Sequence, residues 1–212
     1  MGKINQGILG GFSGKVGTVV GGSWKGITYM RAKAVSVANP RTEAQLSQRA
    51  RFTTALRFLQ PCTDFLRTGY KNYAVKQTAF NAAMSHTLSN AVTGAYPAFG
   101  IDPSKVMLSR GALTTAVNVQ AVVSDGTVKV SWDDNSSLGS AKPTDRALAI
   151  VVNPDNGEAV YKTTGTTRNS SSEMLDIPTD WTGDSAEVYL GFISDDGKEV
   201  ANSVYGGSIL IP

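Results

Sequence analysis

The stretch from Gly10 to Gln48, GGFSGKVGTVVGGSWKGITYMRAKAVSVANPRTEAQLSQ, decides how we interpret the rest of the chain. Its first half interleaves glycine with β-branched and aromatic residues, and its second half breaks at Asn39-Pro40 before a helical pattern. Glycine weakens a strand, so its density here indicates bulges or places where another backbone comes close. We expect short strands at Val16–Val20 and Gly26–Val35, joined by a hairpin turn at Gly21-Gly22.

The second of these strands separates two kinds of side chain. One face would be large and basic, because Ile27, Tyr29, Arg31 and Lys33 alternate with small or apolar residues. Two further residues, Trp24 and Lys25, sit at the turn before it. Trp24 is either a local aromatic plug over the hairpin or an interface anchor, since Trp beside Lys or Arg is common in binding hot spots.

Three helices are expected after the strands. A capping-box pattern and apolar residues at helical spacing predict one long amphipathic helix over Thr42–Gln60, ended by Pro61. A shorter helix is expected over Thr63–Tyr70 and a third over Thr78–Val92. A Pro- and Gly-rich connector then leads to an expected strand at Val106–Leu113.

The beginning of the long helix is rich in polar and basic residues. Arg41 precedes it, and Gln45, Arg49 and Arg51 lie in its early turns. Glu43 is the nearest acid, so local ion pairs cannot occupy these arginines. We expect them to face solvent, a partner's carboxylates or phosphate.

From about Val117 the pattern changes to short strands separated by turn residues such as Asp125-Gly126 and Asn156-Gly157. Seven strands in about a hundred residues predict an antiparallel β-sandwich. The expected strands are Val117–Val123, Thr127–Trp132, Ala147–Asn153, Ala159–Thr164, Glu173–Ile177, Ala186–Ser194 and Glu199–Tyr205.

The formal net charge of +3 is unevenly distributed. From Met1 to Ser85 twelve basic residues stand against two acidic ones, a net charge of +10, and from His86 onward eight stand against fifteen, a net charge of −7. Such asymmetry means that the basic half binds either a polyanion or acidic faces of neighbouring copies and partners. The dense glycines favour the second alternative.

Chemistry-bearing residues do not cluster in the sequence. The single cysteine, Cys62, and the single histidine, His86, fall on separate helical segments, and Cys62 is expected to be a buried apolar residue. The pairs Asp133-Asp134 and Asp195-Asp196 lie at strand ends and are expected to be solvated. We therefore expect no catalytic, cofactor-binding or metal-binding residue, and a protein that is not an enzyme.

The sequence shows no pattern typical of a secretory signal or of a membrane-spanning segment. The residues after Met1 contain no continuous apolar segment, so we expect no secretory signal. Nowhere do ~18 apolar residues follow one another, so we expect no membrane span. The expected location is a virion or the cytoplasm.

Two segments of the last 95 or so residues resemble a fibronectin type III or related immunoglobulin-like domain. The segment VKVSWDD, Val128 to Asp134, is similar to its second strand, and the resemblance implies a buried Trp132. The segment Glu187–Ser203 is similar to the hairpin of its last two strands.

The whole chain resembles an uncharacterised family associated with Bacteroidota and their phages. The resemblance rests on GFSGKVG from Gly11, WKG from Trp24, NPRT from Asn39 with Gln45 and Arg49, and WTGD from Trp181. The pattern NPxTxxQxxxR also looks like segments of phage structural proteins. The resemblance brings no established activity.

Together these features predict an α+β protein. Residues 1–113 would form a Gly-rich hairpin and helical assembly region, and residues 114–212 an immunoglobulin-like antiparallel sandwich. The first functional hypothesis is a structural phage protein that forms a ring, tube or shell with copies of itself and other virion or assembly proteins. The second is a nucleic-acid-binding protein that uses the basic half, and the third is a surface adhesin or carbohydrate binder. The candidate interface residues are Trp24, Lys25, Tyr29, Arg31, Lys33, Arg41, Gln45, Arg49 and Arg51.

Overall fold

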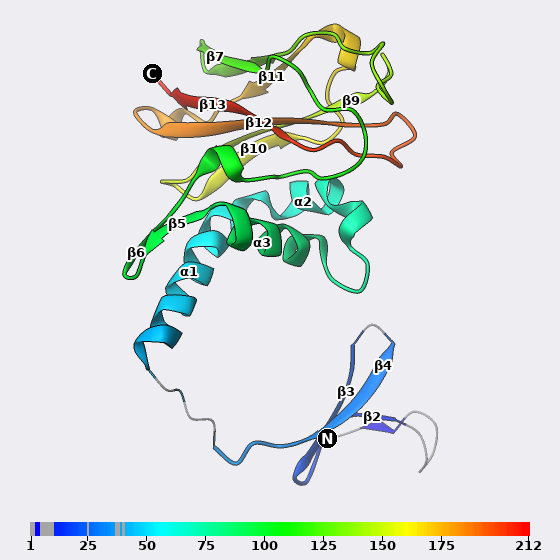
Figure 1. Ribbon diagram of the computed structural model, residues 1–212, viewed down its shortest axis with the longest axis vertical. Helices are drawn as coiled ribbons and strands as arrows, with labels where there is room; N and C mark the ends of the chain where they lie inside the picture. Colours follow the sequence, from blue (N-terminus) through cyan, green and yellow to red (C-terminus); the bar gives the residue numbers. More distant parts are fainter. Residues whose placement is uncertain (1–2, 5–10, 25, 37–38, 40) are drawn as a thin grey trace. The chain divides into compact units, whose positions relative to one another are not determined.

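The computed structural model describes residues 3–4, 11–24, 26–36, 39 and 41–212 of the chain (Figure 1). It divides into two compact units, Met1–Thr42 and Glu43–Pro212, which we call the N-terminal unit and the body. This division differs from the expected boundary after residue 113, which stays a prediction about domain organisation. The class is α+β, as expected from the sequence.

The N-terminal unit is an antiparallel four-stranded sheet in the order β1-β2-β3-β4. Its strands are β1 (Lys3–Ile4), β2 (Phe12–Val16), β3 (Val19–Trp24) and β4 (Ile27–Ala32). The expected hairpin turn at Gly21-Gly22 is wrong, because both glycines lie within β3 and pair with Met30 and Tyr29 of β4. The turn between β3 and β4 contains Gly26, which has a φ of +84°. The expected strand Val16–Val20 is also wrong, because the turn between β2 and β3 interrupts it at Gly17, which has a φ of +56°.

The helices of the body agree with the predicted ones. They are α1 (Glu43–Leu59), α2 (Thr63–Gly69) and α3 (Ala79–Asn90), with short 3-10 turns η1 (Gln60–Cys62) and η2 (Lys71–Tyr73). The hydroxyl of Thr78 accepts a hydrogen bond of 3.1 Å from the Asn81 N–H and caps α3. Cys62 is buried and is the free cysteine that the sequence predicts.

The segment after α3 differs from expectation. It forms a hairpin of β5 (Val92–Ala95) and β6 (Ala98–Ile101), followed by the 3-10 turn η3 (Pro103–Lys105). The expected strand over residues 106–113 is wrong, because these residues join none of the sheets and only Leu113 forms an isolated bridge, with Ala201. Its backbone groups are satisfied one at a time, as when Leu108 N–H donates to Ser203 Oγ at 2.9 Å and Tyr70 Oη donates to Met107 O at 3.0 Å.

The predicted sandwich is present as seven antiparallel strands in two sheets. Four form the sheet β10-β9-β12-β13 and three form the sheet β11-β8-β7. The last strand begins later than expected, because residues 199–203 form a loop with isolated bridges. The strands are β7 (Gln120–Ser124), β8 (Thr127–Ser131), β9 (Arg146–Asn153), β10 (Glu158–Lys162), β11 (Ser172–Asp176), β12 (Ser185–Ile193) and β13 (Val204–Leu210).

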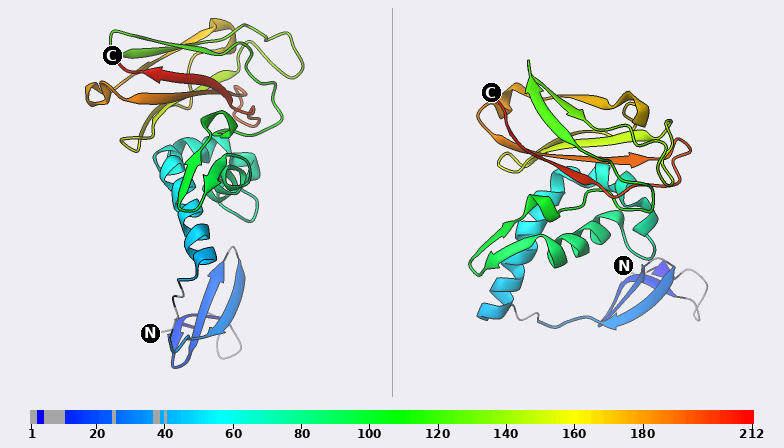
Figure 2. Two further views of the ribbon diagram at one scale, coloured as in Figure 1. Left: turned by 60° about the vertical axis from the view of Figure 1, so that its left-hand side comes forward. Right: turned by 45° about the horizontal axis from the view of Figure 1, so that its top comes forward.

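The four-stranded sheet is the middle of three layers in the body (Figure 2). On its inner face, Val151, Val188 and Phe192 pack with the three-stranded sheet and with the buried Trp132. On its outer face, Ile150 and other side chains pack against the helices. Strands β9 and β12 are therefore buried on both faces, which explains why their sequences are almost continuously apolar rather than alternating.

A buried carboxylate joins β11 to the loop that precedes it. Glu173 accepts hydrogen bonds from the Thr166 N–H, from the Met174 N–H at 3.1 Å and from Lys162 Nζ at 2.9 Å. Burial raises the pKa of Glu173, but these hydrogen bonds and the charge of Lys162 outweigh burial and hold the pKa below its usual value. The charged form therefore stabilises the fold.

This carboxylate predicts an acid-dependent loss of stability. Because its pKa is lowered in the folded state, its contribution is present above the unfolded pKa of about 4.3 and is lost as the pH falls through the folded value. We expect Glu173→Gln to lower the free energy of unfolding by about 1–3 kcal/mol at pH 7 and to flatten its pH dependence below about pH 5. Urea unfolding between pH 3 and 7 measures both effects. If the free energy of unfolding of the variant fell with pH as steeply as that of the wild type, the stabilising role of the Glu173 carboxylate would be contradicted.

Candidate assembly interface on the N-terminal sheet

One face of the N-terminal sheet combines apolar and basic side chains. The β3–β4 register places Trp24 opposite Ile27, Gly22 opposite Tyr29 and Val20 opposite Arg31. Paired residues of antiparallel strands share a face, so these side chains lie together. Trp24 is 57% exposed, Ile27 71% and Tyr29 48%. Lys15 of β2 lies opposite Val20 and adds a second cation to this face.

Two consecutive glycines make this arrangement possible. A Cβ on Gly22 would lie 2.9 Å from the Tyr29 ring, and a Cβ on Gly21 would lie 2.7 Å from the Phe12 ring. Because neighbouring residues of a strand point to opposite faces, the two rings cover β3 from opposite sides. The glycines are therefore needed for close approach within the sheet.

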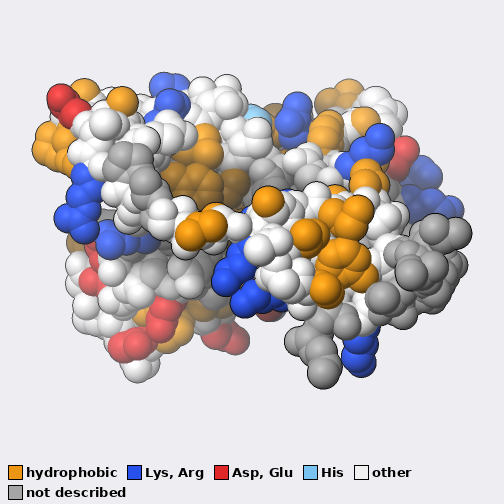
Figure 3. All heavy atoms as spheres, turned by 90° about the horizontal axis from the view of Figure 1, so that it is seen from below, with side chains coloured by type: hydrophobic (Ala, Val, Ile, Leu, Met, Phe, Trp, Pro, Cys, Tyr) orange, Lys and Arg blue, Asp and Glu red, His pale blue; other side chains and the backbone are white. Residues whose placement is uncertain are grey.

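The N-terminal unit has almost no core. Among its described residues only Gly21 is buried, and every residue of β4 is exposed, including Met30 at 71%. Figure 3 shows hydrophobic side chains gathered at the molecular surface with Lys and Arg side chains beside them. Small sheets need a packed apolar face to be stable, so this one lacks the cover that its side chains require.

The candidate interface residues fall on both units. Trp24, Tyr29 and Arg31 share one face of the sheet, as predicted. Lys33 follows β4 and is exposed, and Arg41 is exposed before α1. Lys25 lies outside the described residues.

The remaining candidates lie on α1, which has no buried residue before Ala55. Gln45 and Arg49 are exposed there, and Arg49 has an interaction partner. Arg51 has a structural contact that the sequence pattern did not reveal, because its Nη2 donates to Leu88 O at 2.5 Å near the C-terminal end of α3. The role of the whole set in an interface stays a prediction.

Sequence reasoning missed an acidic surface at one end of the sandwich. Three loops meet there: the Trp181 Nε1 donates to Glu158 Oε2 at 2.8 Å, the Asn153 Nδ2 donates to Asp184 Oδ2 at 2.8 Å, and the Ile177 N–H donates to Gly126 O at 2.9 Å. Residues 124–128, 153–158 and 176–185 contain no Lys or Arg. We call this surface the acidic end, and its six acids are Asp125, Asp155, Glu158, Asp176, Asp180 and Asp184.

The acidic pair Asp195-Asp196, which the sequence places at a strand end, forms ion pairs within the chain. Asp195 lies 3.5 Å from Arg146 Nε, and Asp196 lies 3.1 Å from Lys198 Nζ. Both belong to the β12–β13 loop at the opposite end of the sandwich. The acidic end differs from this loop, because none of its six acids has an ion-pair partner within the described part of the chain.

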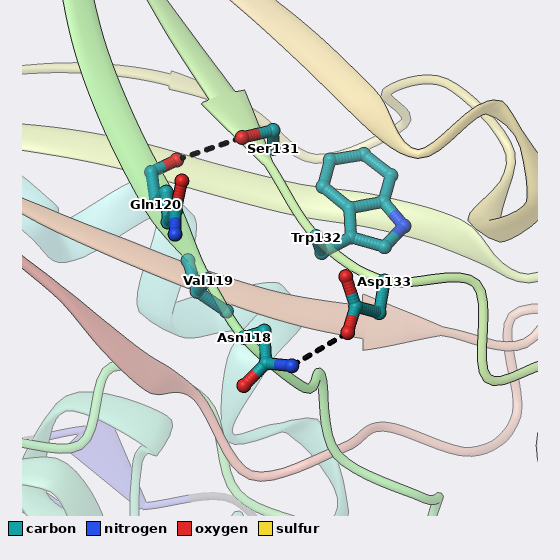
Figure 4. Close-up of a pocket in the computed structure, with 6 residues that line it drawn as sticks. All are labelled: Asn118, Val119, Gln120, Ser131, Trp132 and Asp133. Carbon is teal, nitrogen blue, oxygen red and sulfur yellow. Dashed lines mark hydrogen bonds between the residues drawn. The ribbon is translucent and has the colours of Figure 1, made fainter.

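A pocket of about 430 Å³ lies beside the ends of β7 and β8 (Figure 4). The Asn118 Nδ2 donates to Asp133 Oδ2 at 2.5 Å, and Ser131 Oγ donates to Gln120 O at 3.5 Å. The indole N–H of Trp132 donates to Arg168 O at 2.7 Å and is thereby occupied within the fold. The pocket therefore presents polar groups that largely satisfy one another.

Chemistry-bearing side chains are dispersed elsewhere too. Among the described residues, no group of three or more His, Cys, Asp or Glu side chains could hold a metal ion. Burial raises the pKa of the Cys62 thiol to about 12, so it is protonated at neutral pH. Within the same described ranges, no helix has the length and apolar character to cross a membrane.

Comparison with known proteins places the chain in a family. No curated protein and no solved structure matches it. The sequence profile of the family of unknown function DUF6266 matches residues 11–207, which includes β2, β3 and β4 of the N-terminal sheet, the helices and nearly all of the sandwich. The chain therefore belongs to the DUF6266 family.

Proposed function

We propose that this protein is a non-enzymatic structural protein of a phage virion, which assembles with copies of itself. In this assembly the N-terminal sheet of one copy docks onto the acidic end of the next. The observation that carries the proposal is the exposed apolar face of a sheet that has almost no core of its own. A partner surface would supply the missing cover.

Charge complementarity favours a second copy as the occupant. Residues 1–42 contain six basic residues and no acidic one, whereas the body carries fourteen basic and seventeen acidic residues. The six acids of the acidic end have no basic residue in their own loops. Opposite patches of this kind steer two copies together and set the register of their contact.

The two complementary surfaces are different parts of the chain, so the contact would be heterologous. A heterologous contact forms a ring where the rotation closes and a filament where it does not. A virion component needs such repetition. The resemblance of NPxTxxQxxxR, which begins at Asn39 and ends at Arg49, to segments of phage structural proteins supports this choice, as does the expected association of the family with Bacteroidota and their phages.

The oligomeric state tests the proposal directly. Light scattering coupled to size-exclusion chromatography of the full chain should give a mass that rises with protein concentration and falls with added salt. The salt effect is expected because exposed charges are screened beyond about 10 Å at 0.1 M ionic strength. A monomer at all concentrations in low salt would contradict assembly.

Charge-neutral variants then test the contact surface. We expect Asp125→Asn, Asp155→Asn, Asp176→Asn and Asp180→Asn, combined in one chain, to weaken self-association about tenfold and to reduce its salt dependence. The matched control neutralises four acids at the opposite end, Asp133, Asp134, Asp195 and Asp196. Equal effects in both variants would show that net charge alone governs association and would overturn the docking surface.

Nucleic-acid binding by the basic sheet face is the alternative function that these measurements test. The basic sheet face carries Trp24 and Tyr29, whose rings could stack on bases beside Arg31. Fluorescence anisotropy with a labelled single-stranded oligonucleotide separates the two hypotheses. A monomer whose DNA affinity falls steeply with salt would replace assembly by nucleic-acid binding.

A further inference from the structure

A polar pocket of about 400 Å³ lies against α3 on the helical layer of the body. Helix α3 contributes Ser85, His86, Ser89 and Asn90 to its lining, and Tyr73 and Arg110 also line it. Every residue of this lining belongs to the described part of the chain, and none of them is acidic. The pocket therefore contains a cation without a lining carboxylate to balance it.

The cation is held in a defined orientation. The guanidinium carbon of Arg110 lies 4.5 Å from the centroid of the Tyr73 ring, and that ring packs edge-on against the buried Tyr70 at 6.3 Å. The Arg110 backbone N–H donates to Gly69 O at 2.9 Å, which anchors the main chain. Across the described residues, no hydrogen bond or ion pair of this guanidinium is found, so its N–H groups remain available as donors.

The histidine has an unused nitrogen. Nδ1 of His86 is buried and has no hydrogen-bond partner among the described residues. Burial lowers the pKa of His86 below its usual value, and the positive charge of Arg110 lowers it further, so the ring is neutral at pH 7. Buried polar atoms are nearly always paired, so this unpaired nitrogen makes the wall of the pocket an incomplete polar environment.

We propose that this pocket binds a small anion with a carboxylate or phosphate group, held by Arg110 and His86. The planar guanidinium offers parallel N–H donors that match two oxygens of such a group, and its stacking on Tyr73 fixes their direction. The imidazole of His86 lines the pocket beside Arg110 and, as a neutral ring, carries one N–H donor. At about 400 Å³ the pocket has room for an organic anion as well as for inorganic phosphate. This site is independent of the proposed assembly contact.

The single histidine makes the test specific. Imidazole resonances in a ¹⁵N-labelled full chain come from His86 alone, provided that no histidine tag is present. Titration with inorganic phosphate or with acetate at constant ionic strength should shift these resonances along a saturable curve and should raise the His86 pKa. The anion that saturates at the lower concentration identifies the class of ligand.

Variants separate binding from bulk salt effects. Arg110→Gln is expected to weaken the response at least tenfold, whereas Arg67→Gln, which removes an exposed arginine that pairs with Asp64, should leave it unchanged. His86→Gln, followed through the Arg110 side-chain N–H resonance, gives a second test if Arg110→Gln does not fold. Linear shifts without saturation above about 10 mM, or an unchanged response in folded Arg110→Gln, would overturn the anion site.

Discussion

Replacing Arg168 by Met is expected to lower the free energy of unfolding of the body by about 3–5 kcal/mol, because it leaves a buried carboxylate without its partner. The side chains of Arg168 and Asp145 are both fully buried, and Nε of the arginine lies 3.1 Å from Oδ2 of the aspartate. Nη1 donates to Asn135 Oδ1 at 2.7 Å, and Nη2 donates to Thr114 O at 2.9 Å. The guanidinium also stacks 3.8 Å above the Phe192 ring.

This network joins segments that are distant in the chain. It connects the start of the sandwich at Thr114 and the β8–β9 loop with the turn η4 (Arg168–Ser170), while the Trp132 indole N–H donates to the carbonyl of the same arginine. Thermal unfolding should report the loss as a fall in Tm of roughly 6–20 °C for a unit of this size.

Two controls separate the lost pair from a general effect of removing an arginine. Arg67→Met removes an exposed ion pair and is expected to cost at most about 1 kcal/mol. Adding Asp145→Asn to Arg168→Met removes the unpaired charge and should recover part of the lost stability. If Arg168→Met alone were as stable as the wild type, the structural role of the network would be contradicted.

The second large effect concerns the exposed face of the N-terminal sheet. We expect Trp24→Ala and Tyr29→Ala, singly or together, to weaken self-association. Each of these variants should lose at least about 2 kcal/mol of binding free energy, or roughly thirtyfold in the dissociation constant, because large aromatic side chains act as anchors of interfaces. The two residues share a face with Ile27 and Arg31. Sedimentation velocity across a concentration series measures the change in the dissociation constant.

Matched controls come from exposed apolar residues of the sandwich. Val122 and Met174 are as exposed as Trp24 and lie on β7 and β11, so Val122→Ala and Met174→Ala should leave self-association unchanged. The body has its own core, so its unfolding should be the same in the Trp24 and Tyr29 variants. Unaltered association of the double variant would exclude this face as the contact.

Several elements could be predicted from local patterns because their signals are local. The helical spacing of apolar residues and the turn residues of the sandwich identify α1, α3 and six of the seven sandwich strands within a few residues, whereas β13 begins five residues later than expected. The turn at Gly21-Gly22 could not be predicted correctly. Glycine favours turns, but here it also makes room for the Phe12 and Tyr29 rings, and that contact depends on strand register.

Features that depend on contacts between distant parts of the chain could not be predicted from local patterns. Residues 106–113 have the composition of a strand, but their backbone groups form hydrogen bonds with side chains and with loops such as the one containing Ser203. The candidate anion pocket combines His86 with Arg110, residues that carry no joint motif in the sequence. The acidic end likewise appears only when three loops meet.

The sequence by itself determined the α+β class, the three helices followed by the strands of the sandwich, and the basic glycine-rich beginning, because periodicity, turn chemistry and charge are properties of short segments. The burial of Trp132 followed from the resemblance to a fibronectin type III domain. Only the tertiary structure decided that the helices cover the outer face of the four-stranded sheet, that Arg168 and Asp145 pair inside the sandwich and that six acids share one end of it. These features depend on which faces and loops meet across long sequence separations, and strand pairing and burial settle that only when the whole chain has folded.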